Sequence, residues 1–459
     1  MSEQAKQVFK PALNGGAWWL HPAVAFSLPV VIAGITAYVT GSSSYLRFWR
    51  TQKYFDLSCL GLLFGIVLVF AIGSLLGGAR RRANAADPTA DWKLHIRWQL
   101  VRVLFNLSFV LTIGAYFIWF GVAIKNGLRP SVIYEMFHSS GGATGTMLDD
   151  HLKTIPGVTT ATQFGLAVIV LGVPLGAVAG WRRVRWQMLA VFGLALVRSF
   201  LNSERLAIIE LLVPFIVAFI SFRPPRTRRA RSLIQAAPLF GPVLLFFFFA
   251  GAEYFRSWST YYSQRESSYW SFISLRLMGY YTTALNNGAL VWRVSKHLSY
   301  RLEPETLDFI WRFPIVNRLL PWLFPSFGVP ALVSDYRYDA LLQASANPEL
   351  TNPSGVFGPI VDYGVGGGLL YWFLCGLVCG YLYKELKLRR PAGMLLYPLL
   401  FVGLTEAARI LYWAEGRLFP SMFMLVISIL FILSNRGLRS GTLPLIKEKS
   451  PVGAHSLTV

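Results

Sequence analysis

Long apolar runs, each close to the length of a helix that crosses a bilayer, take up most of this chain. A spanning helix needs about 20 mostly apolar residues, whereas a spanning β-strand shows a shorter, alternating pattern. The runs here are continuous, so they predict membrane helices rather than a barrel. We expect ten spans, at residues 18–41, 57–79, 99–124, 161–181, 187–202, 206–222, 236–255, 356–383, 392–412 and 418–435.

The composition agrees with a polytopic membrane protein. Hydrophobic residues make up 54% of the chain and charged residues 14%, whereas an ordinary soluble domain has about 25% charged residues. We predict an all-α protein in which residues 1–435 form one transmembrane domain and residues 436–459 a cytoplasmic tail. The formal charge of +21 lies mostly in short loops, where it sets topology, so it does not predict nucleic-acid binding.

Basic residues fix the expected orientation. Clusters of arginine and lysine follow the second, fourth, sixth, eighth and tenth spans, and all five fall on one side, which we assign to the cytoplasm. Both termini are then cytoplasmic. The loop 42–56 runs against this pattern, because it carries Arg47, Arg50 and Lys53 on the outer side.

A long outer loop, about residues 256–355, separates the seventh and eighth spans. Loops of this length are usually functional or disordered, and several tryptophans in this one favour burial over disorder. Residues 268–276 and 305–323 have the pattern of amphipathic helices that lie along a membrane surface.

Ionisable residues gather at the outer ends of the expected spans. Such groups at membrane depth are costly and are functional candidates by default. Arginine matters in particular, because its fork of donors matches phosphate and keeps its charge when partly desolvated. Arg198 stands out within an otherwise apolar stretch. The set comprises Arg198, Glu204, Arg205, Arg256, Arg276, Glu406, Arg409, Glu415 and Arg417.

Structural explanations also fit part of this set. Arg417 lies near Trp413 and fits a side chain that extends to the membrane interface. Glu204 and Arg205 are adjacent at a hairpin tip and fit an ion pair there. Glu406 and Arg409 are three residues apart on one expected helix, so their charges could neutralise each other.

The long loop contains one further candidate. Residues 334–339, Ser-Asp-Tyr-Arg-Tyr-Asp, combine carboxylates, an arginine and two tyrosines. This mixture suits sugar binding by stacking and hydrogen bonding, and it equally suits a solvated turn. The sequence has no clustered His and Cys and no nucleotide-binding motif, so we expect no metal site and no cofactor.

Three segments carry a family resemblance. Residues 155–165 read Ile-Pro-Gly-Val-Thr-Thr-Ala-Thr-Gln-Phe-Gly, residues 202–207 read Asn-Ser-Glu-Arg-Leu-Ala, and residues 352–367 read Asn-Pro-Ser-Gly-Val-Phe-Gly-Pro-Ile-Val-Asp-Tyr-Gly-Val-Gly-Gly. Together with the long loop before the third segment, they resemble bacterial O-antigen and oligosaccharide repeat-unit polymerases of the Wzy type. The resemblance covers residues 100–435.

This resemblance implies a GT-C-like, metal-independent glycosyltransferase in the bacterial inner membrane. Such an enzyme moves a growing glycan from undecaprenyl pyrophosphate onto an incoming lipid-linked repeat unit at the periplasmic face. The implied ligands are the lipid-linked oligosaccharide and membrane lipid, with a chain-length regulator and a flippase as candidate partners. An O-antigen ligase-like transferase, and a non-catalytic transporter or partner in polysaccharide export, are the alternatives.

The resemblance also implies roles for residues. Arginines would stabilise the departing pyrophosphate, and we select Arg198, Arg205, Arg276 and Arg409. A carboxylate would accept the proton of the attacking hydroxyl; Glu406 is the first choice, followed by Asp335 and Glu415. Substrate binding falls to residues that stack on sugar rings or contact hydroxyls and phosphates, namely Asp335, Tyr336, Arg337, Tyr338, Asn352, Asp362, Glu415 and Arg417.

Overall fold

The computed structural model describes residues 17–79, 98–131, 134, 155, 157–201, 206–222, 227–259, 261–297, 304–309, 338–388 and 390–434. These residues form helices and connecting turns, with no strand among them. Each of the ten expected spans coincides with a helix. The helices are α2 (Pro22–Val39), α4 (Leu57–Ala79), α5 (Trp98–Lys125), α9 (Phe164–Ala179), α10 (Arg185–Leu201), α11 (Leu206–Phe222), α12 (Arg228–Glu253), α17 (Gly358–Lys387), α18 (Pro391–Glu406) and α19 (Phe419–Ser434).

Six helical stretches in the described part of the chain are long and apolar enough to cross a membrane. They comprise α2, α4, α5, α12, α17 and the stretch from the short helix α8 (Val158–Ala161) into α9. Helices α11, α18 and the first part of α19 are apolar but shorter. The chain is therefore a multi-pass membrane protein, and the full count of ten spans stays a prediction.

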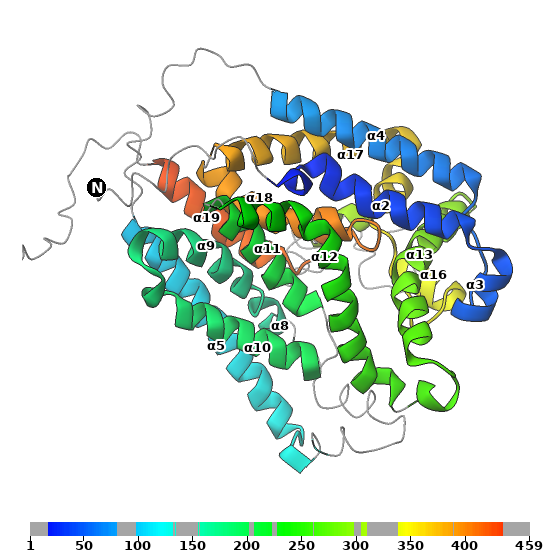
Figure 1. Ribbon diagram of the computed structural model, residues 1–459, viewed down its shortest axis with the longest axis horizontal. Coiled ribbons are helices and arrows are strands. Elements are labelled where there is room, and N and C mark those ends of the chain that lie inside the picture. Colours follow the sequence, from blue (N-terminus) through cyan, green and yellow to red (C-terminus); the bar gives the residue numbers. More distant parts are fainter. Residues whose placement is uncertain are drawn as a thin grey trace, which may run out of the picture.

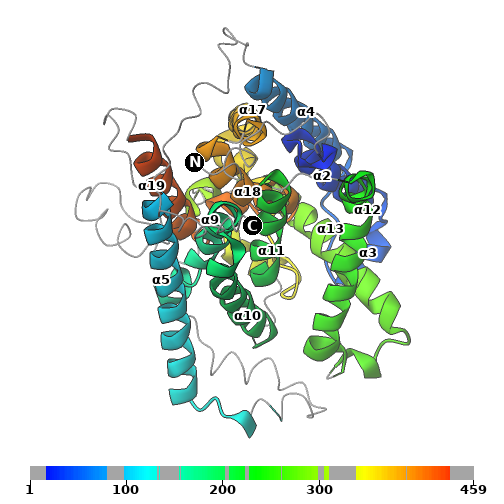
Figure 2. The ribbon, with the colours of Figure 1, turned by 60° about the vertical axis from the view of Figure 1, so that its left-hand side comes forward.

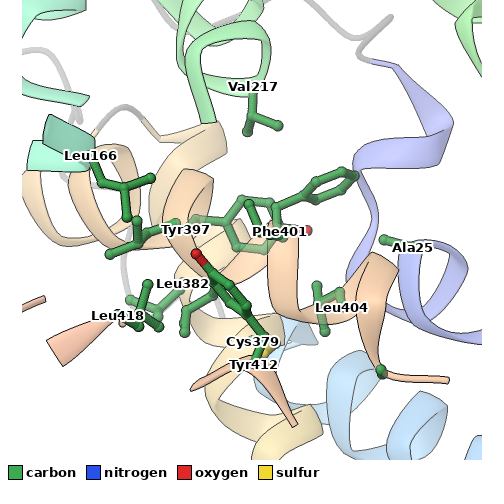
Figure 3. Packing of buried hydrophobic residues seen from close by; sticks show 14 of the residues in the cluster. Ala25, Leu166, Val217, Cys379, Leu382, Tyr397, Phe401, Leu404, Tyr412 and Leu418 are labelled. Carbon is green, nitrogen blue, oxygen red and sulfur yellow. The ribbon is translucent and has the colours of Figure 1, made fainter. Parts of the chain in front are cut away.

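Helix α18 lies at the centre of the bundle. Figure 1 shows α18 among α9, α11, α17 and α19, and nearly all of its residues are buried. In Figure 3, Tyr397 and Phe401 of this helix lie among side chains from α9, α11 and α17. The Tyr397 hydroxyl donates a hydrogen bond to the carbonyl of Leu20, so the core also holds the entry to α2.

Helices α4 and α17 make the closest helix–helix contact. A Cβ atom at Gly376 would lie 2.3 Å from the carbonyl oxygen of Phe70, and one at Gly73 would lie 2.2 Å from that of Phe373. Backbones approach this closely only through glycine, the usual device of helix packing in membranes. Helices α4 and α17 therefore pack directly against each other, backbone to backbone.

Helix α13 (Tyr269–Ser295) differs from the prediction for residues 268–276. Its first turns are amphipathic as expected, but the helix continues to Ser295, and residues from Gly279 to Val291 are largely buried. It contacts α2, α12 and α17. Figure 2 shows α13 beside α12 and the short helix α3 (Ser42–Trp49), away from α5 and α10. Much of the expected outer loop is therefore part of the packed bundle.

Two asparagines explain why a polar helix is buried there. The Asn286 side chain accepts hydrogen bonds from the amides of Tyr54 and Phe55. The Asn287 amide donates to the carbonyls of Leu350 and Asn352, at 2.8 and 3.0 Å. Irregular backbone is tolerated at a membrane edge when such groups satisfy it. Helix α13 thereby fastens two loops to the bundle.

The basic loop 42–56 also has a structural explanation. The Lys53 ammonium donates to the carbonyls of Tyr38 and Thr40, at 2.6 and 2.8 Å, where α2 ends. A cation at a helix C-terminus satisfies unpaired carbonyls and the helix dipole. Lys53 therefore caps a helix, and the expected orientation stays a prediction.

Candidate functional site

Five of the described candidate residues lie at one end of the bundle. Arg198 is near the end of α10, and Glu406 is the last residue of α18. Arg409, Glu415 and Arg417 follow in the turn before α19. We call this the charged end; the predicted orientation places it on the periplasmic side.

Arg198 is buried, and its described contacts include neutral groups. Its side chain is 8% exposed, its Nη1 donates to the Thr162 hydroxyl at 2.8 Å, and its guanidinium lies 5.7 Å from the centre of the Trp119 ring. The Gln163 amide, in the orientation that satisfies both its neighbours, accepts from the same Nη1 at 3.2 Å. The surrounding helices thus fix the guanidinium in one position.

Glu210 is the functional candidate that the sequence reasoning missed. It lies near the start of α11 and is 1% exposed. The Gln163 amide donates to its Oε2 at 3.3 Å, and Arg417 Nη1 lies 3.4 Å from its Oε1. The signal was present, because Glu210 is an acid inside an apolar run, which is the criterion that selected Arg198.

A small cavity lies between Arg198 and Glu210. Thr162, Gln163 and Tyr116 also line it, together with apolar side chains of α9, α10 and α11. Arginine, carboxylate, amide and hydroxyl groups thus line one small space of about 10 Å³, which has room for about one water molecule.

Arg417 connects this cavity to the more exposed part of the charged end. Its side chain is 34% exposed, and besides Glu210 it pairs with Glu415, the Nε–Oε2 distance being 3.4 Å. The buried Tyr412 lies near enough to Glu210, Arg417 and Glu415 to interact with their charges. The guanidinium is shared between two carboxylates at long distances rather than locked to one of them.

Arg409 and Glu406 form the neighbouring pair. Arg409 Nε lies 2.9 Å from Glu406 Oε2, so the pairing expected from their spacing is present. The contact lacks the geometry of a hydrogen bond. Arg409 also interacts electrostatically with Glu415 and with Tyr280 and Tyr281 of α13. It therefore links the turn after α18 to α13.

Arg276 lies in a separate ion-pair cluster. Its Nε lies 2.9 Å from the fully buried Glu253, and its Nη1 lies 2.7 Å from Glu349. Burial alone would lower the pKa of Arg276, but the two carboxylates outweigh burial and hold it above its usual value. Tyr280 of α13 lies near both Arg276 and Arg409. The predicted arginines therefore do not form one cluster.

The two predicted sugar-binding residues near α17 have structural partners. Asp362 Oδ2 accepts from the backbone amide and the hydroxyl of Thr306, both at 2.8 Å, and Oδ1 accepts from the amide of Glu305. This carboxylate anchors a short turn to α17, and its expected role as a sugar ligand stays a prediction. Asn352 contributes its backbone carbonyl to Asn287.

The remaining predicted residues lie outside the described part of the chain. They are Glu204, Arg205, Asp335, Tyr336 and Arg337. Arg256 lies in the turn Tyr254–Trp258 and Tyr338 begins α16 (Tyr338–Ser345), but the side chains of these two residues are not described. The expected amphipathic helix at 305–323 is described only as far as residue 309. Within the described ranges, no group of three or more His, Cys, Asp or Glu side chains could hold a metal ion.

Comparisons with known proteins add no relative. No family model, no curated protein and no solved structure matches the chain.

Proposed function

We propose that the chain is a membrane glycosyltransferase that polymerises undecaprenyl-pyrophosphate-linked oligosaccharide repeat units at the periplasmic face. One observation supports this above the others: the three segments that resemble the polymerase family, far apart in sequence, all border the charged end. Thr162 and Gln163 of the first contact Arg198. Ala207 of the second lines the same cavity, and Ser354 of the third bonds to the backbone of Arg409.

The chemistry of such a transfer suits these residues. The acceptor hydroxyl attacks the anomeric carbon of the donor glycan, the bond from that carbon to the pyrophosphate oxygen breaks, and the lipid pyrophosphate leaves with the electron pair. Negative charge grows on the leaving group, and fixed guanidinium groups stabilise it where they need not reorganise. Arg409 and Arg417 are the more exposed arginines and suit contact with the phosphates. Arg198, lying deeper, suits contact at the reacting end.

Arg276 takes a different part in this proposal. It is held by two carboxylates of its own, so we assign it to the support of α13 and of Tyr280 rather than to the phosphates. Glu349 is the exposed member of that cluster. The phosphate-binding role thus falls on the network that runs from Arg409 to Arg198.

The size distribution of undecaprenyl-linked glycan, in cells with and without the chain, tests the proposal. Loss of the chain should leave single repeat units on the lipid, and its return should restore a ladder of longer products. A ligase-like transferase predicts instead that long lipid-linked polymer accumulates without the chain. A transporter predicts single units that stay on the cytoplasmic face, which enzymatic labelling of intact and opened vesicles separates.

A further inference from the structure

We infer that Glu210 is the proton acceptor for the attacking hydroxyl, an assignment that rests on the proposed transferase function. Sequence reasoning gave this role first to Glu406. The structure favours Glu210, because it lines the cavity together with Arg198 whereas Glu406 does not. Glu406 is turned toward its neighbour Arg409 instead.

Glu210 lies against a cation and a hydrogen-bond donor. Arg417 lies 3.4 Å from one of its oxygens and the Gln163 amide 3.3 Å from the other. The anionic form of a carboxylate is the form that accepts a proton, and an arginine and an amide donor are partners of that form. Among the described residues, the charged or titratable groups near it include Arg198 and Tyr116, which line the same cavity, and Tyr412 and Glu415 beside Arg417.

In this arrangement Arg417 can contact both the pyrophosphate leaving group and Glu210, the proton acceptor. It is shared between Glu210 and Glu415 at long distances and is a third exposed. When a pyrophosphate binds Arg417, the attraction between Arg417 and Glu210 weakens, and the carboxylate becomes a better proton acceptor. Substrate binding would thereby activate the residue that the next step needs.

The proton transfer is balanced without any further reactant. The acceptor hydroxyl forms the new bond to the anomeric carbon, and its proton passes to a Glu210 carboxylate oxygen through one water, for which the cavity of about 10 Å³ has room. The lipid pyrophosphate leaves as the anion. Glu210 then releases the proton to solvent, and the cycle can repeat.

The test uses the purified full-length chain and, as substrate, the lipid-linked unit extracted from cells that lack the chain. The Glu210→Gln variant keeps the shape and loses the charge, so the elongation rate should fall about 10²–10⁴-fold. The wild-type rate should decline at low pH, and the residual rate of Glu210→Gln should lack that decline. Glu385→Gln is the matched control, since Glu385 is a buried glutamate paired with Arg390 at 2.9 Å at the other end of the bundle; its rate should match the wild type.

The outcomes separate the two proposals. Failure of the wild-type chain to elongate this substrate overturns the transferase function itself. Elongation by wild type and by Glu210→Gln at similar rates overturns only the role of Glu210. Should Glu210→Gln fail to fold, Glu210→Asp decides: a shifted midpoint of the low-pH decline supports Glu210, and an unchanged midpoint contradicts it.

Discussion

The amide of Ser354 donates a hydrogen bond to the carbonyl of Arg409, with an N–O distance of 2.9 Å. This bond joins two irregular segments, the entry to α17 and the turn that ends α18. Ser354 has a φ of 70°, which few residues other than glycine adopt. A strained residue of this kind is kept where the surrounding structure determines it, and here it sets the backbone position of a candidate phosphate-binding arginine.

Gly355 should be essential to this junction. A Cβ atom there would lie 2.4 Å from the backbone of Ile410, so Gly355→Ala must push the two segments apart. Misplacement of a binding group by about 1 Å can cost about 10²-fold in rate. We expect a loss of that order in elongation by the purified variant. Gly416→Ala is the control, because a Cβ there meets nothing within 4 Å; equal losses in both variants would contradict the explanation.

The contact between α4 and α17 predicts a stability effect rather than a local one. Gly376→Ala places a methyl group against the Phe70 carbonyl and should lower the free energy of unfolding by about 1–3 kcal/mol or more. Gly366→Ala, on the same helix with open space around it, should change it little. Thermal unfolding of both variants in detergent tests this. Equal thermal stabilities of Gly376→Ala and Gly366→Ala would contradict a close contact between α4 and α17.

Arg276 and Glu253 should behave as a buried ion pair. Arg276→Gln leaves Glu253 without its guanidinium, which typically costs about 3–5 kcal/mol. The double variant Arg276→Gln with Glu253→Gln should recover much of that loss, since neither charge is then buried alone. A double-mutant cycle on thermal stability measures the coupling. Additive effects would show that the pair contributes nothing, and Arg276 would return to the candidates for substrate binding.

Asp56 and Arg293 predict how stability depends on pH. Hydrogen bonds from Ser58 and Cys59 and the charge of Arg293, 2.5 Å away, outweigh burial and hold the pKa of Asp56 below its usual value. A lowered folded-state pKa means that the pair stabilises above the unfolded-state pKa of about 3.9 and that this contribution is lost as pH falls.

The variant Asp56→Asn keeps a side chain that can cap α4 and removes the charge. Both partners are partly exposed, so the difference from wild type at pH 7 should be modest, about 0.2–1 kcal/mol. The difference should shrink as the pH is lowered toward 3 in thermal unfolding experiments. A difference that grows at low pH would contradict the lowered pKa.

The helices could be predicted because their signal is local. Each apolar run between basic loops forms a helix, since continuous hydrophobicity over about 20 residues has few other solutions in a membrane. The burial of α13 could not be predicted in the same way. Its polar residues Asn286 and Asn287 suggest a surface helix, and only their partners in loops more than 60 residues away explain why they are inside.

The candidate site was predicted in its residue types but not in its pairing. The rule that charges at membrane depth are functional selected Arg198 and Arg409, and both lie at the charged end. The link from Arg198 through Gln163 and Glu210 to Arg417 joins segments that are far apart in sequence. Such contacts depend on how α9, α10, α11 and the turn before α19 meet, which no local pattern encodes.

The most direct test of the account is the elongation rate of the purified Arg198→Lys variant on extracted lipid-linked units. Lysine keeps the positive charge but loses the fork that contacts Thr162 and Gln163. The account predicts a folded variant that forms products at least about 10²-fold more slowly, the cost of removing one fixed donor from a site of growing charge. Wild-type ladders and rates from Arg198→Lys would contradict it.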